Sequence, residues 1–292
     1  MTSTQTYLKI KREPLYLLRV YLIEMLVFSL FITLLYSVRE LATVNLSLGL
    51  IALPLAIIFG CMVASFIHNA SHGNVGNRYL NRAVGEFCGT WVLYGFTNFI
   101  LVHLLHHQYS DEELDPVNPK GMSFLIFLSA PMRYMIVVAK KYLFLQHGKS
   151  ANYALIMNTQ TVIFHINLVL KLIFWYLLFG KTLFLFFYLP AFFSNVAILA
   201  HINYVCHRDM EDGTVEMVNL NHNLYYKVAN FITFGGYFHK SHHMKLNVFN
   251  PMKTAQETLP TLKTASYNGN FIARYFDLHN IWGEGQKNKV YH

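Results

Sequence analysis

Four long apolar stretches limit what this chain can fold into more than any other feature of its sequence. Each approaches or exceeds the ~20 residues that a helix needs to cross a hydrocarbon core of ~30 Å. The stretches are Leu15–Tyr36, Leu46–Ile67, Thr161–Phe179 and Thr182–Val205. A chain with this pattern is expected to be an all-α membrane protein with four transmembrane helices.

The composition agrees with a membrane protein and argues against other classes. Of the 292 residues, 54% are hydrophobic and 13% are charged, against about 45–50% and about 25% in soluble domains. Three cysteines are too few for a fold held together by disulfides. The net charge of +8 includes no run of more than two Lys or Arg and no base-stacking motif, so we expect no nucleic-acid partner.

The distribution of basic residues predicts the topology. Twenty of the 23 Lys and Arg lie in the N-terminal segment as far as Arg19, between the second and third spans, or after the fourth span. The positive-inside rule places those three segments in the cytoplasm. The spans then pair as two hairpins, with tight outer turns at the link around Arg39 and at Gly180-Lys181. Both termini are expected on the cytoplasmic side.

Two further apolar segments are interrupted by polar residues. Ala83–His103 contains Glu86 and Asn98, so we predict a helix buried in the protein or lying along the interface rather than a fifth crossing. Met122–Leu145 mixes apolar and basic residues, as an interfacial amphipathic helix does. Together these features predict one membrane-embedded domain over residues 1–292, with a helical cytosolic cap.

Histidines are the unusual residues of this chain, because 15 of them occur in so apolar a sequence. Eight lie in three short boxes. The boxes are His68-Asn-Ala-Ser-His72, His103-Leu-Leu-His106-His107 and His239-Lys-Ser-His242-His243. Residues at i, i+3 and i+4 share one face of a helix, so each box directs its imidazoles into one small volume. The boxes are also expected to carry the catalytic residues.

The chemistry of the boxes predicts bound metal. Clustered imidazoles repel one another once protonated, whereas a divalent metal satisfies them all. Eight histidines exceed the coordination number of one ion, which predicts two ions. The first box has Asn69 where a zinc metalloprotease has its glutamate base. Nitrogen ligands around two ions with room for an exogenous ligand favour redox iron, although ligand type alone does not exclude other metals.

These boxes, in this order between and after two membrane hairpins, resemble those of the integral-membrane fatty acid desaturase superfamily. The resemblance implies a diiron centre that activates O₂, takes electrons from a separate donor and removes hydrogen from an unactivated methylene of a fatty acyl chain. No HPGG haem motif is present, so we expect no fused haem or flavin. A ferredoxin-like protein or a b-type cytochrome is the expected donor, docking on the basic cytosolic face.

The resemblance also implies a ninth ligand near the end of the last span. Asn203-Tyr-Val-Cys-His207 matches the NxxxH arrangement of the superfamily. His207 is then the ninth ligand, and Asn203 contacts the site through water from the same helical face. His201 and His222 are the alternatives.

Carboxylates that follow the second box are candidates for orienting the ligands. Asp111 and Asp115 could each accept the second ring N–H of a ligating imidazole. Glu112 and Glu113 are expected in a solvated loop. Residues just before the second box could line a narrow tunnel for the acyl chain; they are Trp91, Tyr94, Thr97 and Asn98.

The reaction and the carrier of the acyl group remain open at this point. The first box has three intervening residues where acyl-CoA Δ9 desaturases usually have four, which favours acyl-lipid, sphingolipid-type or acyl-carrier-linked substrates, although other acyl-CoA substrates stay open. The same centre also supports hydroxylation, acetylenic bond formation and terminal-alkene formation. A membrane metal transporter is the alternative from another class, but its ligands would lie near the bilayer midplane, and these boxes lie toward the cytosolic side.

Overall fold

The computed structural model describes residues 1–38, 46–119, 121–129, 131–209, 215–255 and 271–278. It forms two compact units, one of residues 1–104 and 139–195 and the other of residues 105–138 and 196–292. Helices dominate both, and the described residues contain one two-stranded sheet, in which β1 (His207–Asp209) pairs antiparallel with β2 (Val215–Met217).

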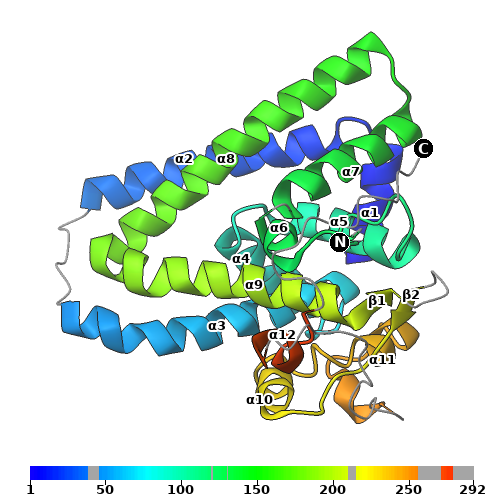
Figure 1. Cartoon of the computed structure of the whole chain (residues 1–292). Coiled ribbons are helices and arrows are strands. Elements are labelled where there is room, and N and C mark those ends of the chain that lie inside the picture. Colours follow the sequence, from blue (N-terminus) through cyan, green and yellow to red (C-terminus); the bar gives the residue numbers. More distant parts are fainter. Residues whose placement is uncertain (39–45, 120, 130, 210–214, 256–270, 279–292) are drawn as a thin grey trace. The chain divides into compact units, whose positions relative to one another are not determined.

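The helices follow one another along the chain as labelled in Figure 1. The first half of the chain, as far as His147, contains α1 (Ser3–Arg12), α2 (Tyr16–Val38), α3 (Leu46–His72), α4 (Arg78–Trp91), α5 (Phe96–Gln108), α6 (Phe124–Ser129) and α7 (Pro131–His147). The second half contains α8 (Ala151–Leu183), a π-helical turn (Phe184–Tyr188), α9 (Leu189–Cys206), α10 (Leu224–Ile232), α11 (His239–Met244), a 3₁₀ turn (Pro251–Lys253) and α12 (Phe271–Tyr275).

Three helices of the described chain are long and apolar enough to cross a membrane, or four if the bent pair α4–α5 forms one span. The first two, Tyr16–Ser37 and Leu46–His72, confirm the first two predicted spans. The third, Ala151–Cys206, is 56 residues long and covers the third and fourth predicted spans. The chain is therefore an all-α, multi-pass membrane protein.

Gly180 divides the third apolar helix. Its φ of 70° and ψ of 171° lie outside the helical region, in a part of conformational space that is open essentially to glycine alone. The rings of Trp175 and Tyr188 stack with centroids 5.5 Å apart, although 13 residues of continuous helix would separate them by about 20 Å. The chain therefore reverses direction here, at the predicted Gly180-Lys181 turn.

Polar contacts join the long helices within the first unit. The Asn167 side chain on α8 donates to the backbone carbonyl of Tyr21 on α2 at 2.8 Å. One turn further along, the Lys171 ammonium on α8 contacts the Glu24 carboxylate on α2 at 2.9 Å, and the Lys171 side chain is almost fully buried. Such contacts are favoured in apolar surroundings, where an unpaired polar group has no water to replace its partner.

The segment predicted as one helix over Ala83–His103 is two helices, so that prediction was wrong. Helices α4 and α5 meet at 98°, and Gly95 between them has a φ of +81°. The indole N–H of Trp175 donates to the Thr90 carbonyl at 3.1 Å, and the Tyr188 hydroxyl donates to the Trp91 carbonyl at 2.9 Å. The Trp91 carbonyl belongs to the last turn, where a helix leaves carbonyls without backbone partners, whereas the Thr90 carbonyl also accepts from the Leu93 backbone N–H at 3.1 Å.

The segment predicted as one amphipathic helix over Met122–Leu145 contains parts of two helices in its described residues. Helix α6 ends at Ser129, and α7 begins at Pro131. Proline has no N–H to donate and is well tolerated at the first position of a helix. Helix α7 therefore begins where the sequence permits a new helix to begin.

The second unit holds the third histidine box in a defined place. Asn219 follows β2, and its amide nitrogen donates to the Ser241 hydroxyl at 2.8 Å. Its carbonyl oxygen accepts from the Ser241 backbone N–H at 3.1 Å. Asn219 and Ser241 are both buried, so this paired contact fixes the short helix α11 against the strand that precedes it.

Candidate metal centre

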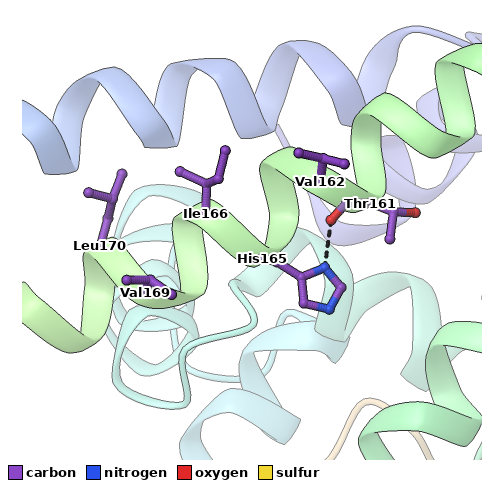
Figure 2. A pocket seen from close by; sticks show the side chains of 6 residues that line it. All are labelled: Thr161, Val162, His165, Ile166, Val169 and Leu170. Atoms are coloured by element: carbon purple, nitrogen blue, oxygen red, sulfur yellow. Dashed lines mark hydrogen bonds between the residues drawn. The ribbon is translucent and has the colours of Figure 1, made fainter.

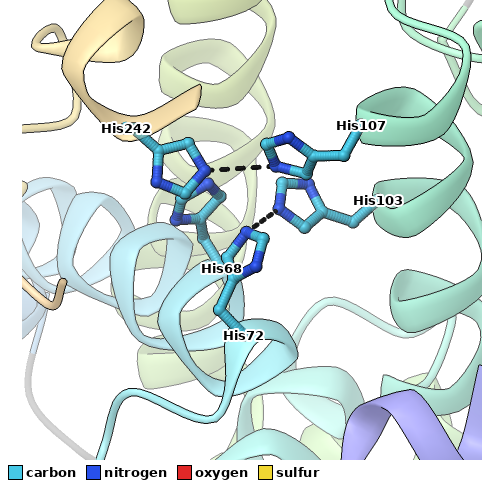
Figure 3. A group of neighbouring side chains, drawn as sticks. All are labelled: His68, His72, His103, His107 and His242. Carbon is cyan, nitrogen blue, oxygen red and sulfur yellow. Dashed lines mark hydrogen bonds between the residues drawn. The ribbon is translucent and has the colours of Figure 1, made fainter. Parts of the chain in front are cut away.

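Three box histidines converge within the first unit. His68 and His72 lie on the last turns of α3, and His103 lies on α5. The Nε2 atoms of His72 and His103 are 2.7 Å apart, a contact drawn in Figure 3. The His68 ring centroid lies 5.2 Å from that of His72 and 4.5 Å from that of His103. Helix α3 ends immediately after them at Gly73, whose φ is +82°, as is common for the residue that follows a helix.

Helix α5 carries the whole second box. His103, His106 and His107 occupy positions i, i+3 and i+4 of this continuous helix, as the spacing predicted. In the second unit, Nε2 of His107 lies 3.1 Å from Nε2 of His242 on α11, the other contact drawn in Figure 3. The second and third boxes therefore meet through this pair.

A second group of four histidines lies wholly within the second unit. His106, His207, His239 and His243 each present one nitrogen, and these nitrogens all lie within 4.8 Å of one another. Nε2 of His239 lies 2.9 Å from Nε2 of His207 and 3.1 Å from Nε2 of His243. The His106 ring centroid is 5.0 Å from that of His207. Three of the four side chains are buried.

The two predicted carboxylates lie against the outer nitrogens of this group. Both Asp115 oxygens lie 3.0 Å from Nδ1 of His106, and Asp111 lies 2.9 Å from Nδ1 of His207. A carboxylate accepts hydrogen bonds and has no proton to donate, which assigns the N–H to Nδ1 in each ring. Nε2 of each imidazole then faces the group with its lone pair, the arrangement that metal-binding histidines adopt.

Asp115 is held as an anion by its surroundings. Burial would raise its pKa, but the hydrogen bond and charge of His106 and the backbone N–H groups of Val117 and Asp111 outweigh burial and leave that pKa below its usual range. The two backbone bonds measure 2.9 and 2.8 Å. Glu112 and Glu113 are exposed, in agreement with the solvated loop predicted for them.

The donor set fits a metal ion. Metal–imidazole bonds of about 2.0–2.1 Å, the length found for zinc, place neighbouring ligand nitrogens about 2.8–3.4 Å apart, from octahedral to tetrahedral angles. The Nε2 atoms of His239, His207 and His243 have this spacing. His239 lies between the other two, and one proton on its Nε2 could serve only one of the two contacts. Burial, followed by the charges of the neighbouring histidines, lowers the pKa of His239 well below its usual value, which favours the neutral form that binds metal.

The three candidates for the ninth ligand lie in different surroundings. His207 belongs to the group of four. His201 forms hydrogen bonds outside this group, with Nδ1 2.6 Å from the Tyr237 hydroxyl and Nε2 2.9 Å from the Phe276 carbonyl. His222 contacts the Asp277 carboxylate at 3.3 Å. The structure thus brings His207, and not its two rivals, among the box histidines.

The predicted helical relation between Asn203 and His207 was wrong. Helix α9 ends at Cys206, and His207 begins strand β1, where it pairs with Met217. The Asn203 side chain is half-buried and donates to the Leu199 carbonyl of its own helix at 2.8 Å. The role proposed for Asn203 through water stays a prediction.

The predicted substrate residues surround the bend between α4 and α5. Trp91 is buried with its ring 4.8 Å from those of Phe59 and Trp175. Thr97 is also buried. Asn98 accepts a hydrogen bond from the Tyr21 hydroxyl and donates to the Tyr94 carbonyl. Contact with an acyl chain stays a prediction for all four.

Phe99 was not among the residues predicted from the sequence. Its ring stacks on the His103 imidazole with centroids 5.3 Å apart and planes 18° apart, and on its other side lies Tyr94, at 6.3 Å. Phe99 precedes His103 by four residues on α5, so helical spacing could have identified it. This stack gives Tyr94 an indirect contact with a box histidine.

A shallow apolar depression on α8 lies outside this set of residues (Figure 2). Its lining residues are Thr161, Val162, His165, Ile166, Val169 and Leu170. Nδ1 of His165 is bound to the Thr161 carbonyl of the same helix at 2.7 Å. None of the predicted site residues lines it.

Comparison with known families gives the same result as the geometry. The family model for fatty acid desaturases matches residues 45–248, which include all three histidine boxes and His207. The chain belongs to the fatty acid desaturase family. This desaturase-family protein is therefore a membrane diiron oxidoreductase, and membership implies a fatty acyl substrate and O₂. Neither the comparison with curated proteins nor that with solved structures gives a match.

Proposed function

We propose that this desaturase-family protein inserts a double bond into a fatty acyl chain at a histidine-ligated diiron centre. The observation that carries the proposal is the group of four converging histidines whose outer nitrogens are held by Asp111 and Asp115. Iron bound there would supply the oxidising power, drawn from O₂ and a separate electron donor. The overall change removes two hydrogens from adjacent carbons of the acyl chain.

The ligands divide into two sets. We assign one ion to His106, His207, His239 and His243, with Asn203 acting through water. We assign the other to His68, His72, His103, His107 and His242. Support for the second set comes from helix α5, on which His103 and His107 are one turn apart and on the same side. Each set then supplies at least four imidazole nitrogens, which suits redox iron.

The chain's own residues have three tasks in this mechanism. The imidazoles present neutral nitrogens, which the carboxylates of Asp111 and Asp115 orient through Nδ1. The paired contact between Asn219 and Ser241 holds α11 in place, and with it the third box. Trp91, Tyr94, Thr97 and Asn98 position the acyl chain near the bend at Gly95.

The proposed topology follows from charge. Four crossings pair as two hairpins, and the single domain over residues 1–292 presents its termini and histidine boxes to the cytoplasm, where most of the Lys and Arg lie. A soluble ferredoxin-like protein or a b-type cytochrome delivers electrons to that basic face. Attraction between opposite charges favours an acidic donor there.

Labelled substrate separates desaturation from its alternatives. A host membrane that expresses the chain is fed acyl chains deuterated at adjacent carbons, under ¹⁸O₂. Desaturation removes one deuteron from each of two carbons and adds no ¹⁸O to the product, whereas hydroxylation adds it. Products are sorted by lipid, CoA and carrier-protein fraction to identify the carrier of the acyl group. His239→Ala serves as the inactive variant, and His165→Ala, which alters a histidine outside the site, serves as the matched control.

A further inference from the structure

A hydrogen-bonded chain of three side chains lies in the second unit, outside the metal-binding group. Nε2 of His201 lies 2.9 Å from the Phe276 carbonyl, which can only accept, so Nε2 carries the proton and donates. Nδ1 of His201 must then accept, and the Tyr237 hydroxyl, 2.6 Å away, donates to it. The Tyr225 hydroxyl lies 2.7 Å from that of Tyr237 and 3.4 Å from Nδ1 of His201, and the shorter contact assigns its proton to Tyr237. The proton order is therefore Tyr225 to Tyr237 to His201.

The chain leads from near the ligands to the surface of the unit. Tyr237 is fully buried and lies two residues before His239, so their Cα atoms are at most about 7 Å apart. Its carbonyl also contacts Sγ of Cys206, the residue that precedes His207. Tyr225, at the other end, is half-exposed. Electrons can thus move between the region of the ligands and solvent in two short steps.

The chemistry of tyrosine decides the direction in which electrons move along this chain. A neutral phenol gives up an electron to a strong oxidant most readily when a base accepts its proton at the same time, and His201 is placed to do so. A neutral phenol does not take up an electron from a reduced donor protein. The chain therefore suits the outward passage of oxidising equivalents and not the delivery of electrons from the normal donor.

We propose that Tyr237, His201 and Tyr225 form a protective redox relay that discharges the oxidised metal centre when no acyl chain is bound. The relay rests on the proposed function, because the oxidant is the metal centre after reaction with O₂. A solution reductant, of the thiol or ascorbate class, reduces the oxidised Tyr225 back to the phenol. Without the relay, the oxidised centre would attack its own ligands.

Each step balances electrons and protons. Tyr237 gives one electron to the oxidised centre, its O–H bond breaks, and the proton forms an N–H bond at Nδ1 of His201. Tyr225 then gives one electron to the Tyr237 radical, His201 returns the proton to Tyr237, and the phenolic proton of Tyr225 passes to water. The solution reductant gives one electron to Tyr225, which recovers its proton from water.

Electron paramagnetic resonance tests the relay directly. The iron-loaded, full-length protein is chemically reduced, exposed to O₂ without substrate and frozen. We expect a tyrosyl radical whose line shape changes when the protein contains ring-deuterated tyrosine. Tyr237→Phe should lose this signal. Tyr225→Phe should keep the radical signal and lengthen the lifetime of the radical several-fold, because Tyr225 can no longer reduce the radical on Tyr237.

Tyr226 provides the matched control. Its ring lies 4.9 Å from that of Tyr237 in the same buried cluster, but its hydroxyl lies outside the hydrogen-bonded chain. Tyr226→Phe should keep the radical and its lifetime. A second measurement counts the minutes of O₂ exposure without substrate that halve the activity, and identifies oxidised ligands by mass spectrometry. Tyr237→Phe should bind iron normally, begin turnover at the wild-type rate and lose activity several-fold sooner.

The outcomes separate the relay from the proposed function. A wild-type protein that holds iron and forms product but shows no radical overturns the relay and leaves the function intact. Equal radical and inactivation behaviour in Tyr237→Phe and Tyr226→Phe overturns it too, because only one of them belongs to the chain. A protein that binds no iron and forms no product contradicts the proposed function. The relay is then contradicted as well, because its oxidant is the metal centre.

Discussion

Asp115 lies with both carboxylate oxygens 3.0 Å from Nδ1 of His106, and both side chains are buried. The contact joins residues nine positions apart, across the end of α5 and the turn that follows it. Because Asp115 also accepts two backbone N–H groups, it cannot rotate away without breaking four contacts. The orientation of His106 is therefore determined before any metal arrives.

Asp115→Asn tests this relationship. The amide can still accept from one neighbour but has lost the charge that stabilises Nδ1–H, and a change of this kind typically costs 10–100-fold in metal affinity or activity. We expect a fall of that order in iron affinity, measured by titration of the metal-free protein. Glu112→Gln, which alters an exposed carboxylate of the same turn, is the control and should match the wild type. Equal iron affinity in all three proteins would show that Asp115 does not orient a ligand.

Replacement of His207 should separate it from its rivals. His207→Ala removes one of four nitrogens from its group, so we expect the iron content to fall from about two ions per chain to about one. His222→Ala should keep both ions, at a cost of about 1–3 kcal/mol in stability because the buried Asp277 loses a partner. Elemental analysis and thermal denaturation measure the two effects. Loss of iron only in the His222 variant would reverse the assignment, and zinc alone in the wild type would refute the diiron proposal.

The topology can be tested with single cysteines. In a background without the three native cysteines, Lys181→Cys and Lys149→Cys each place one thiol at an exposed position. The charge distribution predicts that a membrane-impermeant reagent labels intact cells at position 181 only. Labelling of both positions after the cells are opened is the control for accessibility. Labelling of position 149 alone in intact cells would invert the proposed orientation.

We predict that removing one charge of the ion pair between Glu24 and Lys171 destabilises the protein more than removing both charges. Lys171→Met leaves the Glu24 carboxylate without its partner in apolar surroundings, a loss of about 3–5 kcal/mol for a buried pair. The double variant Glu24→Gln with Lys171→Met should recover most of that stability, because it buries no unpaired charge. Thermal unfolding in detergent measures both. If the double variant is less stable than Lys171→Met, the unpaired charge of Glu24 is not what destabilises the single variant.

Much of the fold and site depends on local spacing and could be predicted for that reason. The apolar runs 15–36 and 46–67 are long enough to cross a membrane by themselves, and Gly180 marks a turn whatever packs around it. His103, His106 and His107 share a helical face through their positions alone. The family resemblance, read from the same boxes, was confirmed over residues 45–248.

Tertiary contacts decided the rest. Asp111 and His207 are 96 residues apart, and no local period could show that they pair, although each was a candidate separately. The sequence could not show that α9 ends at Cys206, because a pairing between β1 and β2 competes with the last helical turn. His201 had the residue type of a ligand, yet Tyr237 and Phe276 engage both its nitrogens. Helical spacing acts over four residues and can be read along the chain, whereas a buried polar group takes whichever partner the folded chain brings to it.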